Sequence, residues 1–398
     1  MDHVVTTLPT ERRPGCPFDP PAELIRAREH GPISPYAFPG GRPGWLVTGF
    51  DLVRAVLADP RFSSRKELMR HPTIDITGME VPPAPPGEFL LMDEPQHSRY
   101  RKPLVGRFTV RRMRQLTERV EQITAEHLDA MEEAGPPTDL VTAFPTPIPA
   151  VMICELLGVP YEDRGSFQEQ VGSFMSGETS DEDLMAAYTA TQEYLAKLVA
   201  AKRADPTDDV LSDLTDSDLT DEELKGMSLI LLAAGLDTTA NMLALGTFAL
   251  LRNPAQLAAL RDDPGLADRA VEELLRYLSV AKTFMRTALE DVELGGRTIE
   301  AGTTVILSYS TANRDPERFT DPHVLDLRRQ DGPHLAFGHG IHQCLGQQLA
   351  RVEMRVAFPA LLHRFPTLRL AVPAEEVRLR PETADIYGVK SLPVTWDA

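Results

Sequence analysis

The ten residues from Phe337 to Gly346 read Phe-Gly-His-Gly-Ile-His-Gln-Cys-Leu-Gly. This stretch places three glycines, two histidines and one cysteine directly before an apolar helical pattern that begins near Leu349. The glycines allow the backbone to turn sharply and to approach a flat partner closely. Cys344 lies just before the helical pattern, where backbone N–H groups and the helix dipole favour a thiolate. A thiolate held in this way is a strong ligand for a soft or borderline metal ion.

A lone cysteine near a glycine is most often a small buried residue of the core. Seven residues of this stretch indicate a different role, because in order and spacing they resemble the haem-thiolate signature of the cytochrome P450 family: Phe337, Gly338, Gly340, His342, Cys344, Leu345 and Gly346. The resemblance implies that Cys344 binds the iron of haem b, that Phe337 packs beside the sulfur and that His342 reaches a haem propionate. It extends to motifs spaced over nearly the whole chain.

The composition, with 398 residues of which 42% are apolar, allows a large core. Length alone suggests two or three domains. However, no linker, charge block or repeat divides the chain, and the resemblance implies one domain over residues 1–398, with an irregular lead-in at residues 1–20. The implied fold is mainly α-helical with small β-sheets, and haem lies between a long central helix and the helix that follows the cysteine loop.

The net charge of −18 argues against a nucleic-acid or anionic-membrane partner. The cysteines Cys16, Cys154 and Cys344 are odd in number and far apart, so they form no disulfide framework and a reducing cytoplasm fits best. Cys154 lies in an apolar helical pattern and is expected in the core. The first ten residues lack a basic segment followed by an apolar run, so we expect no signal peptide and no membrane anchor. These features favour a soluble, cytoplasmic enzyme, and we expect it to be a monomer.

A long central helix is predicted after Thr220. Residues 220–223, Thr-Asp-Glu-Glu, form a capping box, and the helical pattern continues until Pro254 stops it. Residues 221–252 would span roughly 48 Å at the α-helical rise, enough to cross a whole domain. Because the pattern is apolar nearly all round, the helix is expected to be buried. A transmembrane span is disfavoured by the polar residues at its centre: Asp237, Thr238, Thr239 and Asn241.

These central polar residues have a structural and a functional explanation. A threonine hydroxyl that bonds the carbonyl four residues earlier bends a helix. Residues 234–239, Ala-Gly-Leu-Asp-Thr-Thr, also resemble the P450 oxygen-activation motif. That resemblance implies that dioxygen fits beside Gly235, that Thr238 hydrogen-bonds it and that Asp237 relays protons from solvent. Cleavage of the O–O bond needs two protons on the outer oxygen, so an alcohol with an acid behind it suits this chemistry.

Three basic residues are expected to hold the haem propionates together with His342. His97 and Arg101 stand at i and i+4, so both can donate hydrogen bonds to one carboxylate. With the preceding Asp-Glu-Pro of residues 93–95 they resemble the propionate-binding helix of the family. Arg286 resembles the family's arginine that meets a propionate where a strand begins.

A structural clamp is implied by Glu273 and Arg276, at i and i+3. Such a pair is ordinarily a surface ion pair worth under about 1 kcal/mol. The two residues also match the family's Glu-x-x-Arg motif, whose pair is buried and shares a second arginine, here Arg329.

Substrate contacts are predicted partly from a proline-rich loop and partly from the resemblance. Residues 72–90 contain five prolines, which exclude a long helix and leave either a binding loop or a surface loop with apolar anchors. Lys282 and Thr283 are polar, so either their side chains point away from the substrate pocket or the substrate carries a polar or acidic group. The residues expected to face substrate are Phe89, Leu90, Phe174, Thr283, Phe284, Ile386 and Tyr387.

A run of seven cations without an acid among them stands out in this acidic chain: Arg99, Arg101, Lys102, Arg107, Arg111, Arg112 and Arg114. Such a patch can steer an acidic partner. Resemblance to soluble P450s implies that this partner is a ferredoxin, which receives electrons from NAD(P)H through a ferredoxin reductase. No flavin or iron–sulfur module is recognisable in the chain, which agrees with an external electron supply.

The sequence thus predicts a haem-thiolate monooxygenase. It would insert one atom of O2 into a mostly apolar small molecule, as a hydroxylase or epoxidase that tailors secondary metabolites. One alternative is a peroxide-driven peroxygenase, which often lacks the acid–alcohol pair. Another is a catalytically silent P450-like binding or recruitment module, which loss of the cysteine or of that pair would favour. Asp237, Thr238 and Cys344 are all present, and this favours the monooxygenase.

Overall fold

The computed structural model describes residues 4–12, 15–107, 110–165, 181–381 and 384–397. Phe174, one of the predicted substrate contacts, lies outside the described residues. Helices dominate the described chain: α1 Ala22–His30, α2 Phe50–Ala58, α3 Gln96–Val105, α4 Val110–Ala134, α5 Leu140–Ala143, α6 Pro147–Leu157, α8 Asp181–Ala204, α9 Val210–Thr215, α10 Asp221–Leu251, α11 Pro254–Asp262, α12 Ala267–Leu278, α13 Tyr309–Ala312 and α14 Gln347–Arg364.

Short strands form four small sheets: β1 Ile33–Phe38, β2 Arg42–Val47, β3 Phe62–Ser63, β4 Thr138–Asp139, β5 Thr283–Ala288, β6 Val292–Leu294, β7 Arg297–Ile299, β8 Thr304–Ser308, β9 Arg369–Leu370, β10 Arg378–Leu379, β11 Val389–Ser391 and β12 Pro393–Thr395. The largest sheet has the order β1-β2-β8-β5-β3. Its β2 and β8 are parallel, with Trp45 opposite Val305, and its other pairs are antiparallel. The predicted fold class, mainly α with small sheets, is confirmed.

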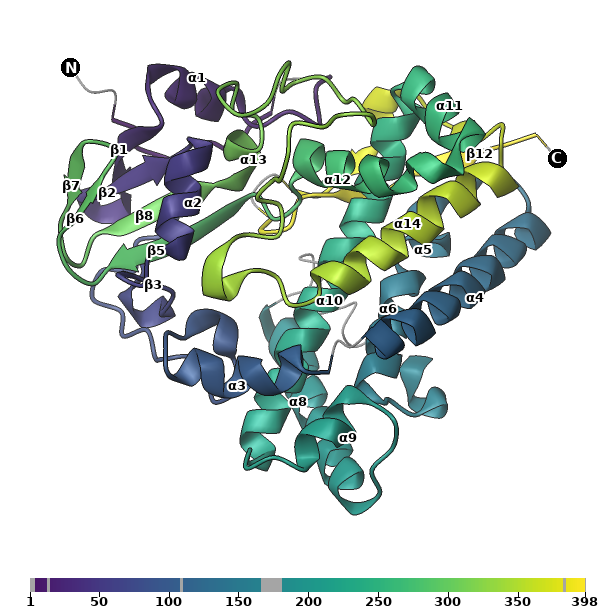
Figure 1. The fold of residues 1–398 in the computed structure, drawn as a ribbon, viewed down its shortest axis with the longest axis horizontal. Coiled ribbons are helices and arrows are strands. Elements are labelled where there is room, and N and C mark those ends of the chain that lie inside the picture. The colour runs from purple at the N-terminus through teal and green to yellow at the C-terminus, as the bar shows by residue number, and fades with distance from the viewer. Residues whose placement is uncertain (1–3, 13–14, 108–109, 166–180, 382–383, 398) are drawn as a thin grey trace.

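The sheet and the helices occupy different sides of the molecule. In Figure 1 the five-stranded sheet lies at the left with α1 and α2, and the remaining long helices fill the centre and the right. The lead-in before α1 is irregular in the part the structure describes, apart from a bridge in which Val5 pairs with Tyr36 of β1. Cys154 is 1% exposed on α6, so it is a core residue as predicted.

Helix α10 runs through the centre of the molecule (Figure 1) and packs against α6, α8, α12 and α14. The predicted capping box is present, since Thr220 Oγ1 accepts a hydrogen bond from the Glu223 backbone N–H and the Glu223 carboxylate accepts one from the Thr220 N–H. The helix ends at Leu251, and Arg252 is its C-cap. Among the described helices α10 alone is long and apolar enough to cross a membrane, and 50% of its apolar window is buried inside the protein.

Helix α14 carries a carboxyl group that sits unpaired in the core. Glu353 is 2% exposed, and its Oε2 has no hydrogen-bond partner among the described residues. Burial raises the pKa of Glu353 to about 8 from its ordinary value of 4.5. At pH values between these two pKa values, Glu353 keeps its proton in the folded protein and loses it in the unfolded chain.

Because the folded pKa is the higher one, Glu353 is expected to lower stability as pH rises. The stability that the protonated Glu353 contributes is fully present below about pH 4.5 and is lost progressively as the pH rises to about 8. Glu353→Gln should remove this part of the pH dependence, on the order of a few kcal/mol in the free energy of unfolding. Urea unfolding of both proteins at pH 5.5 and pH 8.5 measures it. Equal losses of stability in the two proteins would contradict the prediction.

Candidate functional site

The cysteine loop is closed by its own backbone. The Cys344 N–H donates to the Phe337 carbonyl at 2.9 Å, which folds the residues between them into one compact turn. Gly340 has φ +72° in the left-handed region, and a Cβ at this position would stand 2.2 Å from the Leu57 carbonyl oxygen of α2. Glycine is therefore required here, because it allows the loop to lie directly against α2.

The Cys344 sulfur has the surroundings of a metal-binding thiolate. Burial raises the pKa of the thiol, while backbone N–H groups of Gly346 and Gln347 and the charges of Arg101 and Arg351 act to lower it. The residue nevertheless has an exposed surface, so it is not packed into the core as Cys154 is. A coordinated metal ion deprotonates a thiol outright and so overcomes the effect of burial.

Four basic side chains gather beside this loop from three elements. His97 and Arg101 come from α3, Arg286 from β5 and His342 from the loop itself. The rings of His97 and His342 lie 4.2 Å apart between centroids. Burial, together with the charges of Arg286, His97 and Arg101, lowers the pKa of His342 to about 3. The structure thus brings together all four residues that were predicted to hold the propionates.

Several donors in this basic cluster lack an acceptor. The buried atoms His97 Nε2, Arg101 Nη1 and His342 Nδ1 have no hydrogen-bond partner among the described residues. Arg101 donates through Nη2 to the Gln343 carbonyl, and Arg286 donates through Nη1 to the Met285 carbonyl at 2.7 Å. A buried polar atom left without a partner costs roughly 1–3 kcal/mol. The cluster therefore fits a group with acidic oxygens, and the two propionates of a haem are such a group.

Phe337 is held by an ion pair that sequence reasoning missed. The Arg351 guanidinium lies 4.6 Å from the centre of the Phe337 ring. Arg351 donates to both carboxylate oxygens of Glu272, at 2.6 and 3.0 Å. Although burial raises the pKa of Glu272, hydrogen bonds with His334 and Arg351 lower it to about 2. The only sequence signal is that Arg351 follows Cys344 by seven residues, which places it in the second turn of α14.

The centre of α10 shows the hydrogen bond of the structural explanation given above, and the oxygen-activation role of these residues stays a prediction. Thr238 Oγ1 donates to the Ala234 carbonyl at 2.8 Å, the bond that the structural explanation requires. The helix stays continuous through Gly235. Ala234 is exposed although it lies in the middle of a core helix, so this face of α10 borders accessible space. A Cβ on Gly235 would lie 3.1 Å from Ile153 of α6, so Gly235 lies close to that neighbouring helix.

Asp237 has partners that the sequence did not reveal. Arg380 Nη1 lies 2.7 Å from each of its carboxylate oxygens. Asn241, one turn further along α10, donates through Nδ2 to the Asp237 Oδ1 at 2.9 Å. Asp237 is thus fixed on one side by its own helix and on the other by a residue near the C-terminus.

The Glu273–Arg276 pair is buried, with both side chains 2% exposed. Arg276 donates to the two carboxylate oxygens of Glu273 at 2.7 and 2.8 Å, and Arg329 adds a third bond at 3.1 Å. The Asp326 N–H also donates to the same carboxylate. The geometry is therefore that of a buried triad, and a surface ion pair is excluded.

The predicted substrate contacts lie in different environments. Leu90 is 38% exposed and Phe284 is 41% exposed, although Phe284 also stacks on Tyr309 at 4.7 Å. Phe89 and Tyr387 are each 1% exposed. The Arg12 guanidinium covers the Tyr387 ring at 3.7 Å. Thr283 is half-buried in β5, and Ile386 forms an isolated bridge with Ala281. Contact of these residues with substrate stays a prediction.

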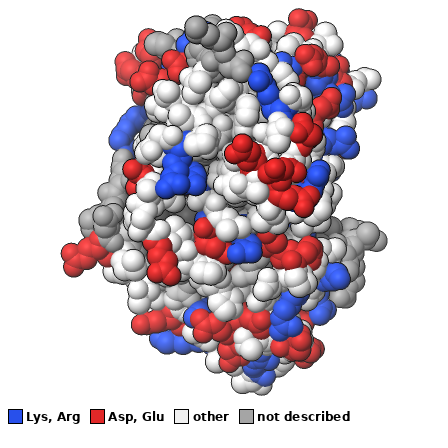
Figure 2. Space-filling view, turned by 90° about the vertical axis from the view of Figure 1, so that its left-hand side faces the viewer, with Lys and Arg blue, Asp and Glu red and all other residues white. Residues whose placement is uncertain are grey.

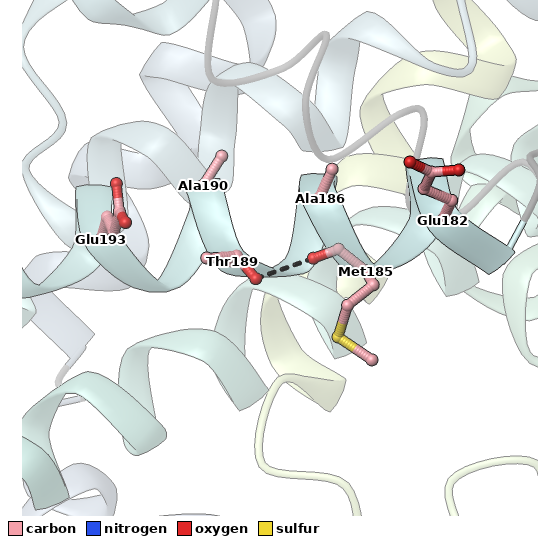
Figure 3. A pocket seen from close by; sticks show the side chains of 6 residues that line it. All are labelled: Glu182, Met185, Ala186, Thr189, Ala190 and Glu193. Atoms are coloured by element: carbon pink, nitrogen blue, oxygen red, sulfur yellow. Dashed lines mark hydrogen bonds between the residues drawn. The ribbon is translucent and has the colours of Figure 1, made fainter.

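An open hollow lies elsewhere, on one face of α8. Figure 3 shows the side chains that line it, with the Thr189 hydroxyl donating to the Met185 carbonyl at 2.8 Å. The lining contains no residue of the cysteine loop or of α10: Glu182, Met185, Ala186, Thr189, Ala190 and Glu193. It is therefore separate from the site described above.

Three of the seven cations in the run pair with acids from residues 208–223. Arg99 pairs with Asp218 and Glu223, whereas Arg107 and Arg112 both pair with Asp213. Lys102 is exposed, and the side chains of Arg111 and Arg114 lie outside the described residues. Figure 2 shows the face on the side of the sheet, where acidic and basic residues are interspersed. Pairing lowers the charge that the run presents to a partner.

A helix-rich fold with a thiolate loop before α14 and a basic cluster beside it has the features of a haem-thiolate protein. A model of the family Cytochrome P450 matches residues 265–389. The chain is 50% identical over 382 residues to cytochrome P450 105C1 of a Streptomyces species. This alignment covers 95% of this chain and 96% of that protein. The chain therefore belongs to the cytochrome P450 family. It is a cytochrome P450 monooxygenase, and its cofactor is haem b.

Other relatives cover the chain equally well. It is 44% identical to pentalenic acid synthase of Streptomyces avermitilis, over 96% of this chain and 95% of that protein. The crystal structure of CYP105P1 in complex with filipin I matches with a TM-score of 0.90 and 42% identity, over 99% of each chain.

Proposed function

We propose that this monooxygenase tailors a secondary metabolite, a mostly apolar small molecule, by hydroxylation or epoxidation. The names of two relatives support the proposal, since one is a pentalenic acid synthase and another was crystallised with filipin I. The exposed apolar side chains Leu90 and Phe284 suit such a substrate. Fold alone does not fix the substrate, so the identity of the metabolite has to come from a binding-shift screen across metabolite classes.

The residues proposed to hold the haem are those of the loop and the basic cluster. The Cys344 thiolate would bind the iron, with Phe337 beside the sulfur. His97, Arg101, Arg286 and His342 would hold the propionates. The observation that carries this assignment is the set of buried donors without acceptors on His97, Arg101 and His342, on the same side of the molecule as the thiol.

Haem held by these residues would supply the oxygen-activating chemistry of the monooxygenase reaction. The chain's own contribution is to hold the thiolate and to supply protons. Backbone N–H groups of Gly346 and Gln347 stabilise the sulfur anion. A threonine hydroxyl both donates and accepts, so Thr238 Oγ1 can take up one proton while it releases another. Asp237 would replace the released proton from solvent.

Electrons are proposed to come from NAD(P)H through a ferredoxin reductase and a ferredoxin. Lys102, exposed on α3, belongs to the run that would guide the ferredoxin. Since Arg99, Arg107 and Arg112 are ion-paired, steering by this run is weaker than its sequence implies. We further propose that the enzyme is a cytoplasmic monomer without nucleic-acid or membrane partners, in agreement with its net charge of −18.

Thr238→Ala is expected to uncouple the reaction. Product formed per NAD(P)H consumed should fall about tenfold or more, because a positioned proton donor contributes typically 10²–10⁴-fold. The electrons should then appear as hydrogen peroxide, measured alongside product. Thr238→Ser keeps the hydroxyl and is the matched control, expected to stay close to wild type. Full coupling in Thr238→Ala would exclude the proposed role.

The same assay separates the two alternative functions. With ferredoxin, reductase and NAD(P)H the wild type should turn over faster than with hydrogen peroxide alone. Faster turnover with peroxide, insensitive to Thr238→Ala, would favour a peroxygenase. A protein that binds haem and substrate but gives no product under either condition would favour a silent binding module.

A further inference from the structure

Arg380 lies 143 residues from Asp237 in sequence, yet it is the cation that meets this carboxylate. A single nitrogen, Nη1, lies 2.7 Å from both Oδ1 and Oδ2. The side chains are only 17% and 13% exposed, so solvent screens this ion pair less than it screens a surface pair. An ion pair shielded in this way can fix the direction in which a carboxylate points.

The strands around Arg380 are fastened to α10 at the same place. Arg380 follows β10, which pairs with β11, and its N–H donates to the Gly388 carbonyl at 2.9 Å. A Cβ on Gly388 would lie 1.7 Å from Asn241 Oδ1, so only glycine allows this hairpin to contact α10 so closely. Asn241 in turn donates to Asp237. Two supports of the carboxylate, Arg380 and Asn241, are therefore tied together through Gly388.

We propose that Arg380 is a positioning residue for proton delivery, which holds Asp237 in the orientation from which it serves Thr238. This inference rests on the proposed relay function of Asp237 and Thr238. An arginine suits the role because it stays charged at all relevant pH values and cannot itself enter the relay. An ionised carboxylate has about four acceptor sites, so Asp237 keeps capacity for a water molecule beside its bonds to Arg380 and Asn241.

The proton balance of the relay is closed without another reagent. Solvent acid, as hydronium or buffer, gives one proton to a carboxylate oxygen of Asp237, and Asp237 passes a proton on toward Thr238 Oγ1. The hydroxyl releases its own proton to the oxygen atom that leaves as water and takes up the new one, and the carboxylate returns to its ionised form beside Arg380. Arg380 loses and gains nothing, and it acts only through the position of Asp237.

Two variants of the holoenzyme test the proposal. Arg380→Gln is expected to lower product per NAD(P)H about tenfold, to increase the solvent isotope effect on turnover and to leave the substrate-binding shift unchanged. Arg380→Lys should restore most of the coupling, because one nitrogen makes both contacts in the structure. Arg378→Gln is the matched control, since Arg378 is exposed two residues earlier in the same hairpin. It should behave like wild type.

A measurement independent of turnover uses urea unfolding of the holoenzyme. The shifts in midpoint caused by Asp237→Asn and Arg380→Gln should not add up in the double variant, because each variant removes the same ion pair. Additive shifts would overturn the proposal, as would wild-type coupling in Arg380→Gln or equal loss in Arg380→Lys. If Asp237→Asn is itself fully coupled, the relay function fails together with the inference. If Asp237→Asn is uncoupled and Arg380→Gln is not, the inference alone fails.

Discussion

Cys344→Ser is expected to abolish both the absorption band of the reduced, CO-bound haem-thiolate and the monooxygenase activity. A serine oxygen is a harder and poorer donor than a thiolate, and it cannot push the electron density onto the iron that favours O–O cleavage. The loss of activity should exceed 10³-fold in order of magnitude, since the whole contribution of the thiolate disappears. The spectrum of the purified, haem-loaded variant measures the first effect, and product formation measures the second.

Matched controls come from the other two cysteines. Cys16→Ser changes an exposed residue and should leave spectrum and activity as in the wild type. Cys154→Ser places a hydroxyl in the core of α6, so it should lower stability without a change in the spectrum. If Cys344→Ser kept its band and its oxygen chemistry, the assignment of the iron ligand would be wrong.

Glu273→Gln is expected to destabilise the protein by about 3–5 kcal/mol, because it leaves the guanidinium groups of Arg276 and Arg329 without their shared counter-ion in the interior. Urea unfolding of the holoenzyme measures the effect, and haem should be released at lower urea than from the wild type. Glu222→Gln is the control, because Glu222 and Lys225 form a pair of the same i,i+3 spacing on the surface of α10. Its cost should stay below about 1 kcal/mol, and a similar value for Glu273→Gln would rule out a clamp.

These two ion pairs show what the sequence could and could not predict. Glu273–Arg276 and Glu222–Lys225 have the same spacing, yet one is buried and the other is exposed. Spacing alone does not distinguish them, because burial depends on which elements pack over the helix. Only the family resemblance identified the buried one. The capping box at Thr220 was predictable without it, since all its hydrogen bonds are made within four residues.

Contacts between distant segments were beyond local reasoning. The separation of Asp237 and Arg380, 143 residues, exceeds any helical or strand period. Glu272 and Arg351 are 79 residues apart, and their pairing follows from the packing of α12 on α14. The charge of the cation run was overestimated for the same reason. The run contains no acid in the sequence, but in the fold its arginines form ion pairs with Asp213 and Asp218. In each case the tertiary fold supplies the partner, whereas the sequence shows only the charge.

The stacking of Arg12 on Tyr387 links the two ends of the chain. The same arginine donates to the carbonyls of Pro17 and Asp19, so the irregular lead-in is fastened over the turn that carries Ile386. Anyone who shortens the protein at its N-terminus for crystallisation, or fuses a reporter there, therefore removes or disturbs the cover of a turn expected to border the substrate.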